Sequence, residues 1–235
     1  MRFRYLVHAI LLSFVVLVIA AVPSRSQGEG LHTPGNGTSG QQSSVSVIPD
    51  PLSPSPQPFN VLHYDAYLDL TAAPSKNMSG RTQITVRWVK EPSEGPFIFH
   101  LRLDSLVIDS VLYDDQRITA TEVGDPSLAT YHFEVTPPST AHSGDVAVVT
   151  VVYHGIMTDE YGPGQWGGVS SGGGVLYALG VGINNNYVST TEHWLACYDH
   201  PSDKATFTGT FVVPSVMPEG TTNVPVNVAL SDGWS

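Results

Sequence analysis

The stretch CYDHPSDKATF at residues 197–207 gathers side chains that could do chemistry. Four residues in it or just before it are of metal-binding type: His193, Cys197, Asp199 and His200. On a helix, the cysteine and both histidines would share one side and could bind zinc. However, Pro201 follows directly and disfavours helical geometry at the residue before it. Structural zinc also takes four ligands, so three soft ones make a metal site the weaker interpretation.

Two other interpretations of this stretch stay open. Cys197 could act as a nucleophile if its pKa were lowered, with His193 or His200 as its base. A thiol without such activation is an inert small side chain that is usually buried, and we favour this interpretation. Asp199 would then organise a structural corner by accepting backbone N–H bonds, as Asp does in turns.

A second unusual stretch, GPGQWGGVSSGGG at residues 162–174, holds seven glycines in thirteen positions. A phosphate-binding loop would place a Lys after the last glycine and a helix behind it. Val175, Leu176 and Tyr177 follow instead. The segment is therefore predicted to be a mobile surface loop, with Trp166 as an anchor or a small-molecule contact.

The composition favours an all-β protein. Of 235 residues, 41% are hydrophobic and only 13% are charged, and 22 Gly and 18 Pro supply many turns. The net charge of −11 argues against nucleic acid as a partner, because phosphate binding needs clustered Lys and Arg. A single cysteine excludes an internal disulfide framework.

The first residues are typical of an export signal. Arg2 and Arg4 precede an apolar stretch at 9–22, and small residues follow that suit cleavage. We therefore predict a signal peptide over 1–22, or to about 27, and an exported protein: periplasmic, cell-surface or extracellular. The apolar stretch is short for a membrane span of about 20 residues. A retained amino-terminal anchor is the alternative, and no stable membrane insertion is expected after cleavage.

Residues 23–58 are predicted to be a flexible linker, because Pro, Ser and Gly dominate and little apolar surface could be buried. From Phe59 onward the sequence is strand-like. In SGRTQITVRWVK (79–90), Ile84, Val86 and Trp88 alternate with polar residues, which indicates a half-buried strand. The strand DVAVVTVVYHG (145–155) is apolar at nearly every position, which predicts a central strand covered on both faces.

Short strands separated by turn residues predict antiparallel sheets in a sandwich or open arrangement. The expected strands lie at 61–70, 79–90, 96–103, 106–114, 116–123, 130–135, 145–155, 206–214 and 223–230. Pro225 should place the last strand at a sheet edge or bulge.

Several motifs in this order resemble the amino-terminal domain of the zinc aminopeptidase family that includes aminopeptidase N. HYDAYLDLT followed by SGRTQITVRW is similar to the opening strands of that domain. HWLACYDHPSDKATFTGTFVVP looks like the family signature W-F-P-C-x-D-x-P-x-x-K-A-T-F, and ALSDG resembles the A-x-S-N-G run that follows it. The likeness spans residues 60–234.

The resemblance implies a saddle-shaped, mainly antiparallel all-β domain over 59–235, incomplete at its carboxyl-terminal end. In the family, a catalytic domain follows and carries G-x-M-E-N and the zinc-binding H-E-x-x-H. Neither motif occurs in this sequence. No catalytic residue, metal ligand or cofactor is therefore expected in this chain, and zinc would belong to the missing catalytic domain.

The resemblance also assigns roles to particular residues. In the family, this domain often offers a Gln or Glu to the amino end of the substrate. Asn185 and Tyr187 stand at the matching positions, and Glu192 is the nearest acid. The structural signature falls on Cys197, Asp199, Pro201, Lys204 and Phe207, while Ala196 replaces the usual Pro.

Two functions follow from these patterns. In the first, the chain is a non-catalytic fragment of an exported aminopeptidase-like protein, which braces the catalytic domain of the same longer protein and walls its peptide cleft. In the second, it is a freestanding secreted module that binds a partner. The chain alone is expected to be inactive under either interpretation.

Overall fold

The computed structural model is built almost entirely of β-strands, which confirms the predicted fold class. It describes residues 2–7, 16–21, 57–72, 75–102, 105–125, 131–159, 167–172, 175–180, 190–200, 203–219 and 222–231. The strands are β1 (Arg2–Val7), β2 (Val16–Ala21), β3 (Phe59–Asp69), β4 (Asn77–Trp88), β5 (Phe97–Phe99), β6 (Leu106–Tyr113), β7 (Gln116–Ile118), β8 (Thr121–Val123), β9 (His132–Val135), β10 (Val146–Ile156), β11 (Gly168–Gly172), β12 (Val175–Leu179), β13 (Thr206–Val212), β14 (Val216–Glu219) and β15 (Thr222–Ser231). Two single-turn 3₁₀ helices, η3 (Pro92–Glu94) and η4 (Thr191–His193), complete the described elements.

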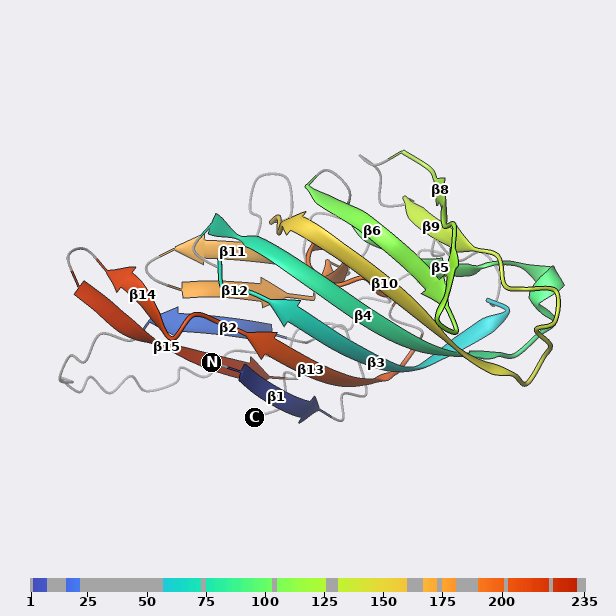
Figure 1. The fold of residues 1–235 in the computed structure, drawn as a ribbon, viewed down its shortest axis with the longest axis horizontal. Coiled ribbons are helices and arrows are strands. Elements are labelled where there is room, and N and C mark those ends of the chain that lie inside the picture. Colours follow the sequence, from blue (N-terminus) through green and yellow to red (C-terminus); the bar gives the residue numbers. More distant parts are fainter. Residues whose placement is uncertain are drawn as a thin grey trace, which may run out of the picture.

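The strands form three sheets, shown in Figure 1. A seven-stranded sheet has the order β1-β13-β3-β4-β10-β6-β7, a five-stranded sheet the order β11-β12-β2-β15-β14, and a three-stranded sheet the order β5-β9-β8. Among the described strands, β13 and β3 make the single parallel pair. The prediction that Pro225 places its strand at a sheet edge or bulge is wrong, because β15 lies between β2 and β14. Pro225 is tolerated because it lies just before the ladder with β2 begins at Val226, so its missing N–H leaves that ladder intact.

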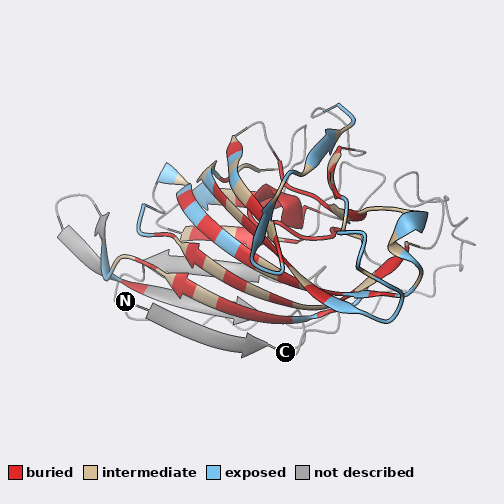
Figure 2. Cartoon of the chain, turned by 45° about the vertical axis from the view of Figure 1, so that its right-hand side comes forward, coloured by how far each residue is buried: buried red, intermediate tan, exposed pale blue. Residues whose placement is uncertain are grey.

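Strand β4 shows why the sequence pattern could be read directly. Its burial alternates residue by residue, with Ile84, Val86 and Trp88 buried and Arg87 exposed. Figure 2 shows the same alternation of buried and partly exposed positions along the large sheet. Side chains on a strand point to opposite faces in turn, so one face of the sheet lies on the core.

Strand β10 is central, as predicted, because it pairs with β4 on one side and β6 on the other. The prediction that both of its faces are covered is only partly right, since Thr150 on the second face is buried. Val149 and Val151 are fully buried, whereas Val148 and Val152 on the other face are half-buried and His154 is exposed. Valine is favoured on a strand even where solvent reaches it, so a run of valines did not mean two covered faces.

The predicted mobile loop at 162–174 is wrong for residues 168–172, which form strand β11 and pair with β12. The start of the strand depends on Gly168, which has a positive φ of 69°. A side chain there would lie 2.7 Å from the Thr158 carbonyl oxygen, so only glycine fits this position. Trp166 lies outside the described residues.

The predicted strand at 116–123 is divided between two sheets. Its first part, β7, pairs with β6 in the seven-stranded sheet, and its second part, β8, pairs with β9 in the three-stranded sheet. The chain therefore crosses from one sheet to the other within this run.

A β-bulge lies where β10 meets β6. The register shifts between Val152 and Tyr153, so Asp109 is an extra residue on β6. Gly155 follows with a φ of 138°, and the next residue, Ile156, donates its N–H to the Ser105 carbonyl oxygen over 2.8 Å. A Cβ on Gly155 would overlap that same oxygen. This position therefore requires glycine.

Strands β1 and β2 fall within the predicted signal peptide. Strand β1 pairs with β13 at the edge of the large sheet, and β2 pairs with both β12 and β15. The signal peptide and its cleavage stay predictions. No helix among the described residues has the length and apolar character needed to cross a membrane.

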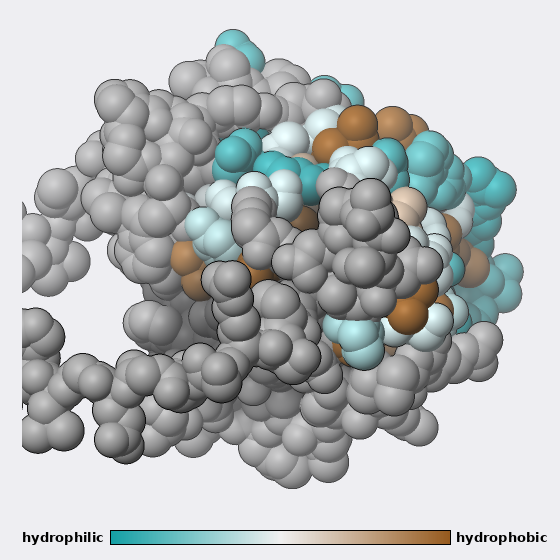
Figure 3. All heavy atoms as spheres, turned by 90° about the vertical axis from the view of Figure 1, so that its left-hand side faces the viewer, coloured by the Kyte–Doolittle hydropathy of each residue, from teal (hydrophilic) through white to brown (hydrophobic). Residues whose placement is uncertain are grey.

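The core is rich in aromatic side chains that join the large sheet to the three-stranded sheet. Phe59 packs edge-on against Trp88, Phe97 and Tyr198, with ring centroids 4.8–6.4 Å apart. Phe99 stacks on Phe133 at 5.0 Å. Such pairs stabilise the fold beyond their buried area. At the end of the molecule shown in Figure 3, the described hydrophobic residues form small separate groups among hydrophilic ones.

Candidate functional site

The stretch around Cys197 lies deep inside the protein. Residues 190–199 are buried almost throughout, and His200 is half-buried. Cys197 forms an isolated antiparallel bridge with His100: the His100 N–H donates to the Cys197 carbonyl oxygen over 2.7 Å, and the Cys197 N–H donates back over 3.2 Å. The segment is therefore fixed by backbone pairing to the chain just after β5.

Two tyrosines from the large sheet satisfy the backbone of this segment. The Tyr198 N–H donates to the hydroxyl of Tyr64 on β3 over 3.1 Å. The hydroxyl of Tyr153 on β10 donates to the Trp194 carbonyl oxygen over 3.3 Å and accepts the Ala196 N–H over 3.4 Å. Buried backbone groups need such partners. Burial raises the pKa of Tyr64 and Tyr153 well above the usual range, so both stay protonated.

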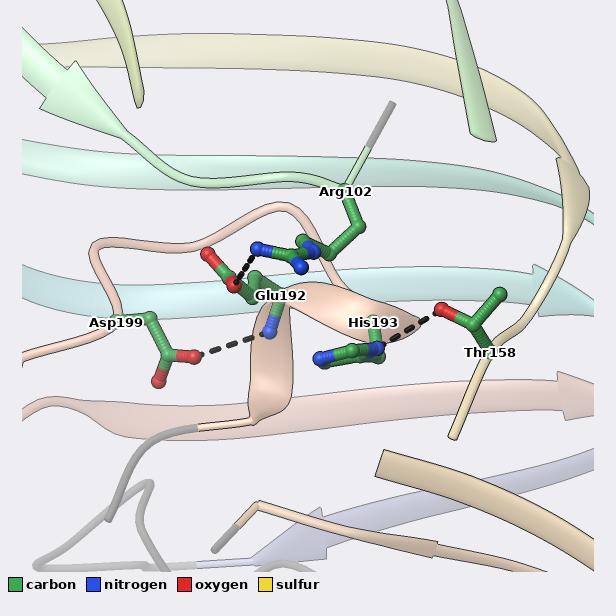
Figure 4. Close-up of polar contacts among 5 residues, drawn as sticks. All are labelled: Arg102, Thr158, Glu192, His193 and Asp199. Atoms are coloured by element: carbon green, nitrogen blue, oxygen red, sulfur yellow. Dashed lines mark hydrogen bonds and ion pairs between the residues drawn. The ribbon is translucent and has the colours of Figure 1, made fainter. Parts of the chain in front are cut away.

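Asp199 has the acceptor role that the sequence predicted, but with a distant partner. Its Oδ2 accepts the buried Glu192 N–H over 3.0 Å. That N–H belongs to η4, seven residues earlier, so the carboxylate ties two segments together. The Glu192 carboxylate lies 3.4 Å from the Arg102 guanidinium, and both side chains are about 10% exposed. Figure 4 shows these groups converging at η4.

The candidate zinc ligands do not converge. The His193 Nδ1 is 2.8 Å from the Thr158 hydroxyl, as Figure 4 shows. The Asp199 carboxylate is held by the Glu192 N–H. Within the described part of the chain, no group of three or more His, Cys, Asp or Glu residues is placed to hold a metal ion. The arrangement of these residues does not fit a zinc site.

His100 is held neutral beneath the segment. Its Nδ1 accepts the Asp199 N–H over 3.1 Å, which requires that nitrogen to be unprotonated. Burial, together with the nearby His132 and His200, lowers the pKa of His100 to about 3. His100 is thus a neutral acceptor in the core and not a general base.

Acid should destabilise the protein through this histidine. The unfolded side chain binds a proton below pH 6.5, whereas the folded one resists protonation down to about pH 3. Above pH 6.5 this histidine therefore does not lower stability. As the pH falls from 6.5 to about 3, it lowers the free energy of unfolding by about 1.4 kcal/mol per pH unit. The His100→Asn variant keeps an acceptor oxygen but cannot be protonated, so chemical denaturation should show that slope reduced by about this amount. Equal acid slopes in both proteins would contradict the assignment, and parallel curves between pH 7.5 and 9 serve as the control.

The single thiol is inert in the folded protein. Cys197 is fully buried, and burial raises its pKa well above the usual range, with Asp199 and Glu192 adding to the rise. A nucleophilic cysteine needs the opposite shift. The expected buried thiol is confirmed.

A disulfide reagent such as Ellman's reagent should therefore label Cys197 at least about 100-fold more slowly in the native protein than in guanidinium, because only the rare opened state exposes a thiolate. The unfolded sample, which should reach one thiol per chain, is the control. Native labelling as fast as that of a free cysteine would show that the thiol is accessible.

Removing the Asp199 carboxylate should cost more than removing the neighbouring imidazole. Asp199→Ala leaves a buried N–H without its acceptor, a loss of about 1–3 kcal/mol. Asp199→Asn keeps an acceptor oxygen and should cost less. His200→Ala should cost less than about 1 kcal/mol, because His200 is only half-buried. Thermal and urea unfolding would measure the stability losses of the three variants. A larger loss for His200→Ala than for Asp199→Ala would support a metal site at this stretch.

The other predicted residues have different surroundings. Phe207 is fully buried in β13, whereas Lys204 is exposed. Asn185, Tyr187 and Pro201 lie outside the described residues. Glu192, the third tentative substrate contact, is only 8% exposed and faces Arg102.

Sequence reasoning missed the groups that hold the segment from a distance, namely Tyr64, His100, Arg102, Tyr153 and Thr158. Tyr64 shares its face of β3 with the buried Ala66 and Leu68, so alternation could have placed it in the core. Nothing in the sequence could have paired it with Tyr198, because that contact depends on how the strands are ordered in the sheet.

In the described part of the chain, the buried segment 190–199 is tied by hydrogen bonds to the large sheet and to the chain after β5. No family model matches the sequence, and no curated protein matches it either. Solved structures do match. An M1 zinc metallopeptidase from Deinococcus radiodurans, in a variant bound to a Tyr-Ser-Ala substrate, superposes with a TM-score of 0.52 at 21% identity over 72% of this chain and 39% of its own.

Two further structures give the same result. A two-domain M1 zinc metallopeptidase variant bound to L-tryptophan superposes with a TM-score of 0.54 at 21% identity, over 74% of this chain and 40% of its own. Yeast LTA4 hydrolase superposes with a TM-score of 0.50 at 16% identity, over 73% of this chain and 26% of its own. The structural neighbours of this chain are M1 zinc metallopeptidases, and it shares the fold of a part of those longer proteins.

Proposed function

We propose that residues 59–235 form the non-catalytic amino-terminal β domain of an exported, zinc-dependent aminopeptidase-like protein. The observation that carries this proposal is the match to M1 zinc metallopeptidases over 72–74% of this chain but only 39–40% of two of those proteins. The family signature in the sequence supports the same placement independently of the fold.

In this proposal the domain braces a catalytic domain and walls its peptide cleft. The segment that carries the signature is suited to a rigid support, because Cys197 is a buried thiol and Asp199 bonds to the backbone. Its neighbour His100 is held neutral by burial, which lowers its pKa. Side chains committed in this way supply stiffness instead of acid–base chemistry.

The substrate contact proposed for this domain narrows to Asn185 and Tyr187. Glu192 is 8% exposed, and its carboxylate lies beside the Arg102 guanidinium. An acid that already has a buried cation beside it is a poor receptor for a second cation such as a substrate amino group. In this proposal Glu192 is a buried structural residue of the cleft wall and does not contact the substrate.

The test begins with the coding sequence downstream of Ser235. An in-frame continuation with H-E-x-x-H supports the proposal, and a stop codon at that point overturns it. The longer polypeptide should hydrolyse aminoacyl amides and lose this activity with a chelator, whereas the 235-residue chain should be inactive. Chelator-sensitive hydrolysis by the 235-residue chain alone would contradict a non-catalytic role.

One observation favours a second function, a freestanding secreted binding module. A surface groove of about 470 Å³ lies along β6, β7 and β8, with Ile108, Ile118 and Phe133 among its lining residues. A stop codon after Ser235, together with a partner that protects this groove from labelling, would support that function.

A further inference from the structure

Strand β2 lies between β12 and β15 in the five-stranded sheet and fills a slot one strand wide between them. Residues 17–20 pair with β12, from Ala178 to Val175, and residues 16–21 pair with β15, from Ser231 to Val226. Both pairings are antiparallel. Figure 1 shows β2 lying between these two strands. Without β2, the sheet would separate into the hairpins β11–β12 and β14–β15.

The same residues belong to the predicted signal peptide. Cleavage near Ala20, Ala21 or Ser24 would remove β1 and the part of β2 that fills this place. Strands β12 and β15 would then face each other about 10 Å apart, which is two strand spacings. That distance is too long for direct hydrogen bonds. Open strand edges of this kind recruit another strand or aggregate.

We propose that a strand donated by the remainder of the longer polypeptide occupies this slot in the mature protein, and that residues 16–21 only hold the place in the uncleaved chain. The proposal rests on the proposed function, because the chain spans only 39–40% of two of its structural neighbours. A donor in the same polypeptide has the advantage of a high effective concentration over a second copy.

The strands on either side of the slot also determine which sequence can fill it. It must run antiparallel to both β12 and β15, as β2 does, over about five residues. Buried Leu176 and Ala178 alternate with half-buried Tyr177 on β12. The sequence that occupies the slot, VLVIAA, is apolar throughout. The donor is therefore an apolar, β-branched segment without charge or internal Pro.

Hydrogen exchange read by mass spectrometry tests the proposal on three proteins: the 1–235 chain, the 23–235 chain and the longer polypeptide that begins at residue 23. Protection of residues 175–179 and 226–231 should be present in the first, lost in the second and restored in the third. Strands β4 and β10 serve as the internal control for folding. If β4 and β10 also lose protection, the 23–235 chain has not folded. The test then depends on whether residues 175–179 and 226–231 are protected in the longer polypeptide.

A synthetic peptide of residues 14–23 with a solubilising tag should bind the 23–235 chain and restore protection, whereas the same peptide with Ile19→Lys should not. The longer polypeptide should not bind the peptide, because its slot is filled. Unprotected β12 and β15 in the longer polypeptide would overturn the proposal, as would persistent protection in a monomeric 23–235 chain without peptide. Protection that depends on concentration, with a dimer mass by light scattering, would assign the slot to a second copy and also overturn it.

Peptidase activity of the longer polypeptide is measured separately. An active enzyme with an open slot would refute the donated strand and leave the proposed function standing. A filled slot in a polypeptide without chelator-sensitive activity would do the reverse.

Discussion

Replacing Arg102 with Met is expected to lower the free energy of unfolding by about 3–5 kcal/mol. The substitution keeps an apolar stem but takes the guanidinium from its place 3.4 Å from the Glu192 carboxylate, in a region where both side chains are about 10% exposed. Removing one partner of a buried ion pair leaves the other charge in a poorly solvated place, and the loss is of this size. Urea unfolding at pH 7 would measure it.

The matched controls change Glu192, the partner of Arg102 in this ion pair. Glu192→Gln should be destabilising as well, but the double variant Arg102→Met, Glu192→Gln should lose less than the sum of the two single losses. The 3.4 Å between the guanidinium and the carboxylate is longer than a strong charge-assisted bond. We therefore expect the coupling free energy between the two charges to be small. Additive losses would show that the two charges do not stabilise each other.

Gly155→Ala is expected to be at least as damaging, by about 3–5 kcal/mol. The residue combines a φ of 138°, which side chains rarely adopt, with a Cβ position that overlaps the Ser105 carbonyl oxygen. That oxygen also accepts the Ile156 N–H. The chain near the bulge must therefore move, and the β10–β6 ladder with it. Thermal unfolding would measure the loss.

Gly144→Ala separates the two causes. Gly144 also has a positive φ, of 95°, but a Cβ there would meet nothing within 4 Å. Its loss should be about 1–2 kcal/mol from backbone strain alone. If both variants lost the same amount, the contact with Ser105 would not explain the requirement for glycine at 155.

The fold was predictable where the local pattern and the tertiary environment agree. Alternation in β4 correctly assigned Ile84 and Val86 to the core, because a strand in a one-sided sheet must place every second residue there. The same logic overestimated burial on β10. Strand β11 was missed because its glycine-rich sequence has no strand preference of its own, and it becomes a strand only beside β12.

The site was predictable only in part. The sequence suggested a structural corner with Asp199 as acceptor, and the structure shows that acceptor role. It could not identify Glu192 as the donor, or Tyr64 and Tyr153 as the groups that satisfy the corner from β3 and β10. The contacts of the two tyrosines join residues 41–134 positions apart. They depend on which strands become neighbours, and local sequence does not encode that choice.

The parallel pair of β3 and β13 has a consequence for biosynthesis. His63 on β3 and Thr206 on β13 touch through a 2.7 Å hydrogen bond, yet they are 143 residues apart in the chain. A ribosome that adds about 5–20 residues per second needs roughly 7–30 s to cover that distance. Throughout this interval one edge of β3 has no native neighbour. The large sheet therefore cannot be completed until β13 has been synthesised, and translation sets the earliest moment at which it can form.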